Sequence, residues 1–127
     1  MTDTHSSDEQ RWLTQLRKGL LEVCTLVVLS QEDGYGYQIV QRLKQVDGLT
    51  MNEGTVYPIL QRLHREGCLA TYRQPSESGP PRKWFQLTQA GRERLLSMIR
   101  EWGRLHRGVQ QLLHEGVDAL EEKRDPS

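Results

Sequence analysis

A single pair of strand-like runs interrupts a chain whose apolar residues otherwise repeat at helical spacing. The runs, Leu69–Arg73 and Lys83–Leu87, are short and rich in residues that favour strands. The nine residues between them include Ser, Gly and Pro, so the pair predicts one β-hairpin with a long exposed tip. A chain of 127 residues has room for about one domain around this hairpin.

Three helical segments precede the hairpin. Residues 11–30 carry two adjacent apolar stripes, and a helix with two apolar faces must contact two different partners. Residues 34–36, Gly-Tyr-Gly, predict a tight turn, after which residues 37–46 resume helical spacing. A capping box at residues 50–53 predicts the start of a third helix, which we expect over 52–66.

A last helix follows Thr88, and its apolar residues alternate steps of four and three over nearly three heptads. This is the pattern of a coiled-coil seam, which a single small domain cannot bury. We therefore expect a two-fold homodimer, in preference to a last helix that folds back on its own domain. The expected interface residues are Leu13, Leu16 and Leu20 from the first helix and Leu95, Met98, Trp102, Leu105, Val109 and Leu112 from the last.

The order of helix, helix, helix, hairpin and helix predicts the fold class. We expect a mainly α chain with a small β-hairpin, namely a winged helix-turn-helix plus a long C-terminal dimerisation helix. The expected organisation is a disordered polar N-terminus at 1–10, a winged-helix DNA-binding domain at 11–87, a dimerisation helix at 88–117 and a polar tail at 118–127.

The net charge of zero conceals an uneven distribution. Residues 11–114 carry 15 basic against nine acidic side chains, whereas both ends of the chain are acidic. A basic folded part fits a nucleic-acid partner. The hairpin tip at 74–83 ends in Arg82 and Lys83, which would place two cations beside a phosphate backbone, and one of Trp84 and Phe85 should face the core.

The outer face of the third helix carries side chains that read DNA bases in other proteins. Arginine pairs with guanine and glutamine with adenine, although an ordinary solvated face has the same composition. The basic hairpin that follows favours the DNA interpretation. The candidate DNA-binding residues are Tyr37, Asn52, Thr55, Tyr57, Gln61, Arg62, Arg65, Arg82 and Lys83.

Three motifs resemble the PadR family of winged-helix transcriptional regulators: GYGYQIVQRL (34–43), NEGTVYPILQRLHREGCL (52–69) and GPPRKWFQLTQAGRERL (79–95). The resemblance covers roughly residues 16–112 and is closest to the subgroup with one C-terminal helix. It implies a homodimeric repressor that reads an inverted repeat in double-stranded DNA. It also places DNA contacts at Tyr37, Thr55, Tyr57, Arg62, Arg82 and Lys83.

The role of Trp102 stays open at this point. In some members of the family that the chain resembles, an aromatic residue near this position lines a pocket for a small flat hydrophobic effector. A tryptophan on a heptad seam is more often simple packing. We therefore expect that Trp102 packs within the dimer seam. A pocket for an effector that relieves repression is the second interpretation.

Other functional classes find less support in the sequence. The four histidines lack the spacing of a metal site, and no nucleophile elbow or phosphate-binding glycine loop occurs, so we expect neither an enzyme nor a cofactor. No apolar run is long enough for a membrane span. Cys24 and Cys68 form no CxxC, which favours reduced thiols in a cytoplasmic protein over a disulfide. The alternative function is a protein–protein interaction module on a winged-helix scaffold without direct DNA binding.

Overall fold

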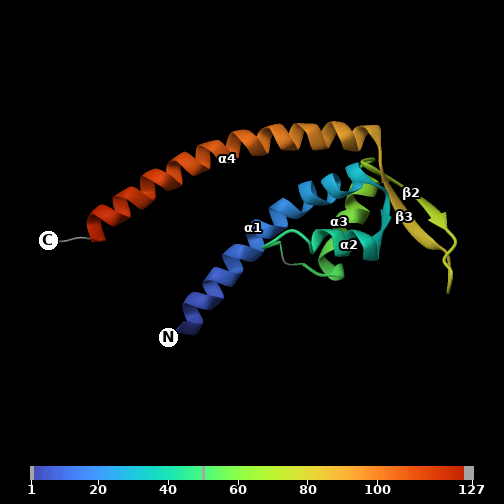
Figure 1. Cartoon of the computed structure of the whole chain (residues 1–127), viewed down its shortest axis with the longest axis horizontal. Helices are drawn as coiled ribbons and strands as arrows, with labels where there is room; N and C mark the ends of the chain where they lie inside the picture. Colours follow the sequence, from blue (N-terminus) through green and yellow to red (C-terminus); the bar gives the residue numbers. More distant parts are fainter. Residues whose placement is uncertain (1, 50, 125–127) are drawn as a thin grey trace. The chain divides into compact units, whose positions relative to one another are not determined.

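The computed structural model describes residues 2–49 and 51–124 of the chain (Figure 1). These residues form two compact units, of which the first ends at Leu95 and the second begins at Leu96. Among the described helices, none combines the length and apolar character that a membrane span needs. The elements in chain order are α1 (Thr2–Gln31), β1 (Gly34–Tyr35), α2 (Gly36–Leu43), α3 (Glu53–Arg65), β2 (Leu69–Gln74), β3 (Arg82–Leu87) and α4 (Gln89–Arg124).

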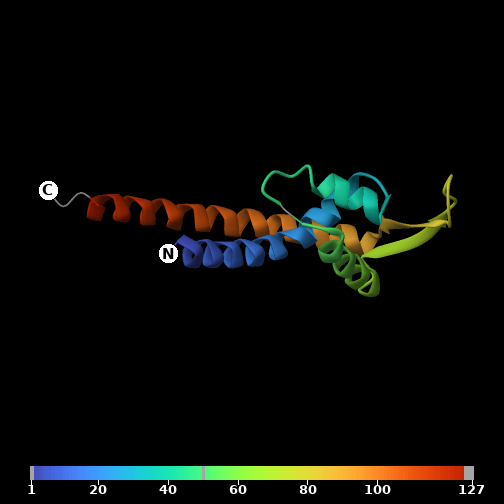
Figure 2. The same cartoon turned by 90° about the horizontal axis from the view of Figure 1, so that it is seen from below.

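The fold class is confirmed: the chain is mainly helical, and β2 and β3 form the expected hairpin, here called the wing. Six residue pairs join the two strands antiparallel, from Leu69 opposite Leu87 to Gln74 opposite Arg82. Figures 1 and 2 both show the wing projecting beyond α2 and α3. The tip is closed by a hydrogen bond in which the Ser76 hydroxyl donates to the Pro80 carbonyl oxygen at 2.9 Å. A positive φ of 134° at Gly79 turns the chain there, in a region that favours glycine.

The predicted tight turn at residues 34–36 is wrong. Gly34 and Tyr35 form the strand β1, which pairs antiparallel with β3 and places Gly34 opposite Phe85 and Tyr35 opposite Trp84. The sheet order is therefore β1-β3-β2. An open edge of β3 would leave backbone groups unpaired, and β1 covers this edge at Trp84 and Phe85. A strand this short shows no alternation, so the sequence pattern did not reveal it.

The core of the first unit lies where α1, α2, α3 and the sheet meet. α1 contributes the stripe that includes Leu21 and Leu29, while the neighbouring stripe through Leu16 remains partly or fully exposed. Phe85 is 3% exposed and Trp84 is only half-buried, so Phe85 is the aromatic residue that faces the core. Each such large side chain stabilises the fold by about 1.5–3 kcal/mol when it is fully buried.

Both terminal helices extend further than predicted. α1 already includes residues 2–10, which differs from the expected disordered segment, and α4 continues through the expected polar tail as far as Arg124. Helix propagation costs little once a nucleus exists, so polar flanks can join a stable helix. In α1, Arg11 and Asp8 form an exposed ion pair at 3.4 Å, because residues three apart lie on the same side of a helix.

The start of α3 also differs in detail from the prediction. Thr50, the expected capping residue, lies outside the described residues. The N-cap of α3 is Asn52, whose side-chain oxygen accepts a hydrogen bond from the backbone N–H of Thr55 at 3.0 Å. Asparagine is as good an N-cap as threonine or better, which explains the shift of two residues.

Candidate nucleic-acid interface

The exposed face of α3 borders a hollow of about 600 Å³ that opens towards the wing. We call it the wing-side hollow. It brings together five of the nine candidate DNA-binding residues, and these come from three separate elements. The hollow is lined by Tyr35, Gly36, Tyr37, Tyr57, Gln61, Arg82, Lys83 and Phe85.

A close approach between α2 and α3 shapes this hollow. A methyl group at Gly36 would overlap the phenol ring of Tyr57, so only a glycine lets the ring lie against the start of α2. Tyr57 nevertheless stays 39% exposed, and Tyr37, the neighbour of Gly36, is also exposed. The two phenols thus stand on adjacent helices beside the same opening.

Aromatic side chains hold the basic residues of the wing in place. The Arg82 guanidinium lies over the Tyr35 ring at 4.4 Å from its centroid, and the Lys83 ammonium lies 5.5 Å from the centre of the Phe85 ring. Trp84 contacts Tyr35 edge-on at 5.2 Å between ring centroids. Cation–π contacts of this kind restrain long basic side chains that stay exposed. Both cations therefore remain available to an anion at the base of the wing tip.

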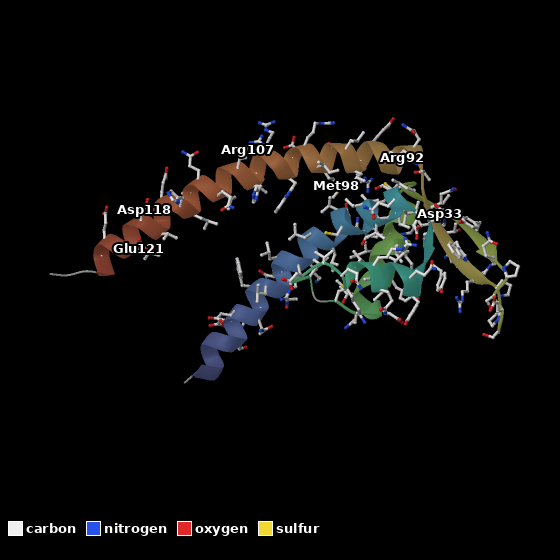
Figure 3. All side chains as sticks on the ribbon, in the orientation of Figure 1. Asp33, Arg92, Met98, Arg107, Asp118 and Glu121 are labelled. Atoms are coloured by element: carbon white, nitrogen blue, oxygen red, sulfur yellow. The ribbon has the colours of Figure 1, made fainter. Side chains whose placement is uncertain are left out.

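A partly buried hydrogen bond connects the wing with the segment that follows α1. The Tyr72 hydroxyl donates to the Asp33 carboxylate at 2.6 Å, and this bond, reinforced by desolvation, raises the pKa of Tyr72 above its ordinary value. Tyr72 also stacks on Trp84 with centroids 6.2 Å apart. Figure 3 labels Asp33 at this junction between the end of α1 and the sheet. Sequence reasoning missed Asp33 and Tyr35, because their partners lie about 40 to 50 residues away.

Two candidate residues take part in the helix cap. The side-chain oxygen of Asn52 accepts hydrogen bonds from both the backbone N–H and the hydroxyl of Thr55, at 3.0 and 3.2 Å. Thr55 is half-buried as well. These contacts make the pair a structural feature of the start of α3, whatever else Asn52 touches.

Arg62 differs most from its expected role as a free base-reading side chain. Its guanidinium forms an ion pair with Glu22 of α1 and a second, at 3.5 Å, with Glu66. Glu66 also pairs with Arg94 at the start of α4. The hydrogen bond to Glu22 raises the pKa of Arg62, and Arg94, with Arg62, lowers the pKa of Glu66. Arg62 thus connects α3 with α1, a contact that helical spacing cannot predict.

A second hollow, of about 590 Å³, lies on the other flank of α3, against α1. We call it the α1-side hollow. Arg65 of α3 lines it and is exposed, and so does Lys18 of α1, which sequence reasoning assigned no role. The lining consists of Lys18, Gly54, Thr55, Pro58, Ile59, Arg62 and Arg65.

The candidate dimer residues divide into three groups by exposure. Leu16, Trp102, Leu105, Val109 and Leu112 are exposed, while Leu13, Leu20 and Met98 are half-buried. Leu95 is the exception, because it is 6% exposed and belongs to the core of the first unit. Its assignment to a dimer seam is therefore wrong. The predicted seam began at Leu95, the last residue of the first unit. Only the part of α4 beyond Leu95 can belong to a dimer seam.

The exposed apolar surface of α4 is larger than the predicted seam. Figure 3 labels Met98 and Arg107, which are nine residues or two and a half turns apart and therefore lie on opposite sides of α4. Trp102 stacks on His106, with ring centroids 5.3 Å apart. The exposed apolar residues that the prediction missed are Trp12 of α1 and Leu96, Ile99, Leu113, Val117 and Leu120 of α4.

Among the residues that the structure describes, no group of His, Cys, Asp and Glu could hold a metal ion. Cys24 and Cys68 are both free, and burial raises the pKa of the Cys24 thiol, which makes it a poor nucleophile.

Comparison with known proteins gives one consistent family. The model of the transcriptional regulator PadR-like family matches residues 25–97, more than half of the chain. A PadR family transcriptional regulator from Eggerthella lenta is 32% identical with a TM-score of 0.74, over 87% of this chain and 96% of that one. A PadR-like transcriptional regulator from Bacillus cereus is 35% identical with a TM-score of 0.70, over 78% and 96%. A Streptococcus transcriptional regulator is 38% identical with a TM-score of 0.69, over 77% and 96%.

These solved structures share the winged helix-turn-helix that α2, α3 and the wing form here. A family of regulators also agrees with a basic hollow at the wing. The chain therefore belongs to the PadR-like family of transcriptional regulators.

Proposed function

We propose that this DNA-binding transcriptional regulator is a homodimeric repressor that reads a short inverted repeat. α3 would enter the major groove of each half-site, and the wing would contact the flanking backbone. The observation that carries the proposal is the wing-side hollow, where Tyr37, Gln61 and the wing cations converge from three elements. Gln61 offers an amide for a base edge, and Arg82 and Lys83 supply charge for phosphates.

The candidate residues take different roles in this proposal. Gln61 and Arg65 are exposed on α3 and would contact bases or groove phosphates, while the Tyr37 and Tyr57 hydroxyls would position the backbone. Arg82 and Lys83 would bind phosphates without regard to sequence. Asn52 and Thr55 would act through the cap that fixes the start of α3, and Arg62 through its ion pair with Glu22.

The exposed apolar residues of α1 and α4 support the homodimer. Trp102, Leu105 and Leu112 repeat at heptad-like spacing on α4 and are 46–67% exposed in the single chain. Large exposed apolar patches mark interaction surfaces, and a second copy supplies an identical patch. A two-fold dimer would also match a two-fold symmetric operator, with one half-site for each recognition helix.

An effector remains part of the proposal at Trp102. The indole is 46% exposed and stacks on the His106 ring, so a flat hydrophobic molecule would meet an aromatic surface there. Binding of such a molecule between the α4 helices of a dimer would alter the spacing of the two α3 helices. The test is the quenching of tryptophan fluorescence by flat aromatic compounds, with Trp102→Phe as the control for Trp12 and Trp84.

A gel shift with the DNA upstream of the protein's own gene tests the proposed function. We expect a shifted band that resists a scrambled competitor duplex and that contains two chains for each site. A transcription assay with the same DNA should then show repression. A band that the scrambled duplex removes equally well, or activation in place of repression, would contradict the proposal. Failure to shift any duplex at low salt would favour the protein-interaction module.

A further inference from the structure

The two flanks of α3 differ in what they touch. Tyr57 and Gln61, four residues apart, border the wing-side hollow. Pro58 and Arg65 border the α1-side hollow. α3 thus presents its exposed ridge between two concave surfaces of nearly equal size. In the proposed function the wing-side hollow contacts DNA through several residues, whereas the α1-side hollow contributes Arg65 alone and Lys18 has no role.

The α1-side hollow carries positive charge that the protein does not neutralise. Lys18 and Arg65 are exposed, and neither forms an ion pair within the part of the chain that the structure describes. Arg62, on the floor of the hollow, is neutralised by Glu22 and Glu66, and Glu66 is itself shared with Arg94. Two cations therefore remain for an outside anion.

The geometry of α1 explains why Lys18 stands there. Lys18 and Glu22 are one helical turn apart, so their side chains lie on the same side of α1. The ion pair of Glu22 with Arg62 holds that side of α1 against α3. Arg62 is consequently a positioning residue that brings Lys18 to the recognition helix.

We propose that the α1-side hollow binds the DNA phosphate backbone on the side of the major groove away from the wing, through Lys18 and Arg65. This inference rests on the proposed function. A helix in the major groove, which is about 12 Å wide, lies between two phosphate backbones. The wing supplies cations for one of them, and the α1-side hollow supplies cations for the other. α1, expected to serve only the core and the dimer, then contacts DNA as well.

The salt dependence of DNA binding measures this contact. Fluorescence anisotropy would follow the binding of a duplex from upstream of the protein's own gene at a series of salt concentrations. Each phosphate contact contributes about 0.9 to the slope of log K against log salt. Lys18→Gln should therefore lower the slope by about 2 for a dimer, and so should Arg65→Gln and Lys83→Gln. Lys123→Gln also removes one positive charge, but Lys123 lines neither hollow. This substitution should therefore leave the slope unchanged.

Lysine acetylation of the wild-type protein tests the same contact without a mutation. The chain contains four lysines, of which Lys18 and Lys83 should be protected from acetylation by the duplex, whereas Lys123 should react equally with and without it. If Lys83→Gln lowers the slope while Lys18→Gln matches Lys123→Gln, or if Lys18 stays fully reactive, the inference is wrong and the proposed function stands. If the wild-type protein binds no duplex, both fail together.

Discussion

Single side chains in this protein act mainly through the helix that they fix in place. Gly36 permits the contact of Tyr57 with α2, Asn52 caps α3, and Arg62 connects α3 with α1. None of these contacts reaches DNA directly in the proposal, yet each sets where an exposed side chain stands. Substitutions at these positions should therefore change the stability of the protein and its affinity for DNA without changing which base sequence it prefers.

Gly36→Ala should destabilise the protein and weaken DNA binding. The added methyl group would overlap the end of the Tyr57 ring and displace it from α2, and because Tyr57 is 39% exposed the cost should lie near the lower end of the roughly 1–3 kcal/mol that overpacking costs in a core. Gly19→Ala is the matched control, because nothing lies within 4 Å of the methyl group it adds to α1. Alanine in a helix interior should stabilise by about 0.5–1 kcal/mol. Urea denaturation measures both, and equal effects of the two substitutions would refute the contact.

Gln61→Ala and Arg62→Ala should affect DNA binding in different ways. Loss of the Gln61 amide should relax the choice among single-base variants of the operator, because Gln61 is exposed beside the wing. Arg62→Ala should lower affinity for all duplexes alike. It should cost no more than about 1 kcal/mol of stability, since its ion pairs are partly exposed. Competition titrations with single-base variants measure the difference, and altered base choice in Arg62→Ala would restore it as a reading residue.

At the scale of elements, the wing is fastened to the rest of the first unit by side chains from β1 and the end of α1. Tyr35 holds Arg82 and Trp84, while Asp33 holds Tyr72. The wing as an element was predictable from its composition, because short strand-like runs and a Ser-Gly-Pro loop have a distinct pattern. The attachment of the wing was not predictable. β1 has only two residues, too few to show a period, and Asp33 is distant in sequence from its partner Tyr72.

The attachment of the wing predicts a pH dependence. The hydrogen bond to Asp33 raises the pKa of Tyr72 in the folded state, so it stabilises the fold below the unfolded pKa of about 10. This contribution is lost as the pH rises through the folded pKa. Absorbance at the tyrosinate band, compared with Tyr72→Phe, should show Tyr72 titrating above the ordinary tyrosine pKa. Asp33→Asn should lower its pKa, and an unchanged titration would contradict the assigned bond.

The buried and exposed faces of a helix could be predicted wherever its apolar residues repeat at helical spacing. The stripe of α1 that includes Leu21 and Leu29 enters the core, and the stripe through Leu16 stays open, because the 3.6-residue period separates the two faces. Leu95 shows the limit of this reasoning. It fits the heptad of α4 but is buried in the first unit, since periodicity cannot tell where a helix leaves its own domain.

At the scale of the whole molecule, the account depends on a second copy of the chain. α4 exposes a long apolar side between Ile99 and Leu120, with Arg107 on the other side. Leu105→Glu would place a charge within the apolar side, and we expect the dimer to dissociate into monomers. Arg107→Glu introduces the same residue on the opposite side and should leave the dimer intact. Light scattering distinguishes these states, and a Leu105→Glu dimer would rule out this interface.

In the proposed function, α3 and the wing together bind a specific DNA sequence. Fluorescence anisotropy with the DNA upstream of the protein's own gene, titrated beside a scrambled duplex at low and moderate salt, tests it most directly. We predict tight binding of the upstream duplex by two chains, a preference for it at both salt concentrations, and a loss on the order of a thousandfold between them from several phosphate contacts. Equal and weak binding of both duplexes, abolished by salt, would contradict sequence-specific recognition of this DNA.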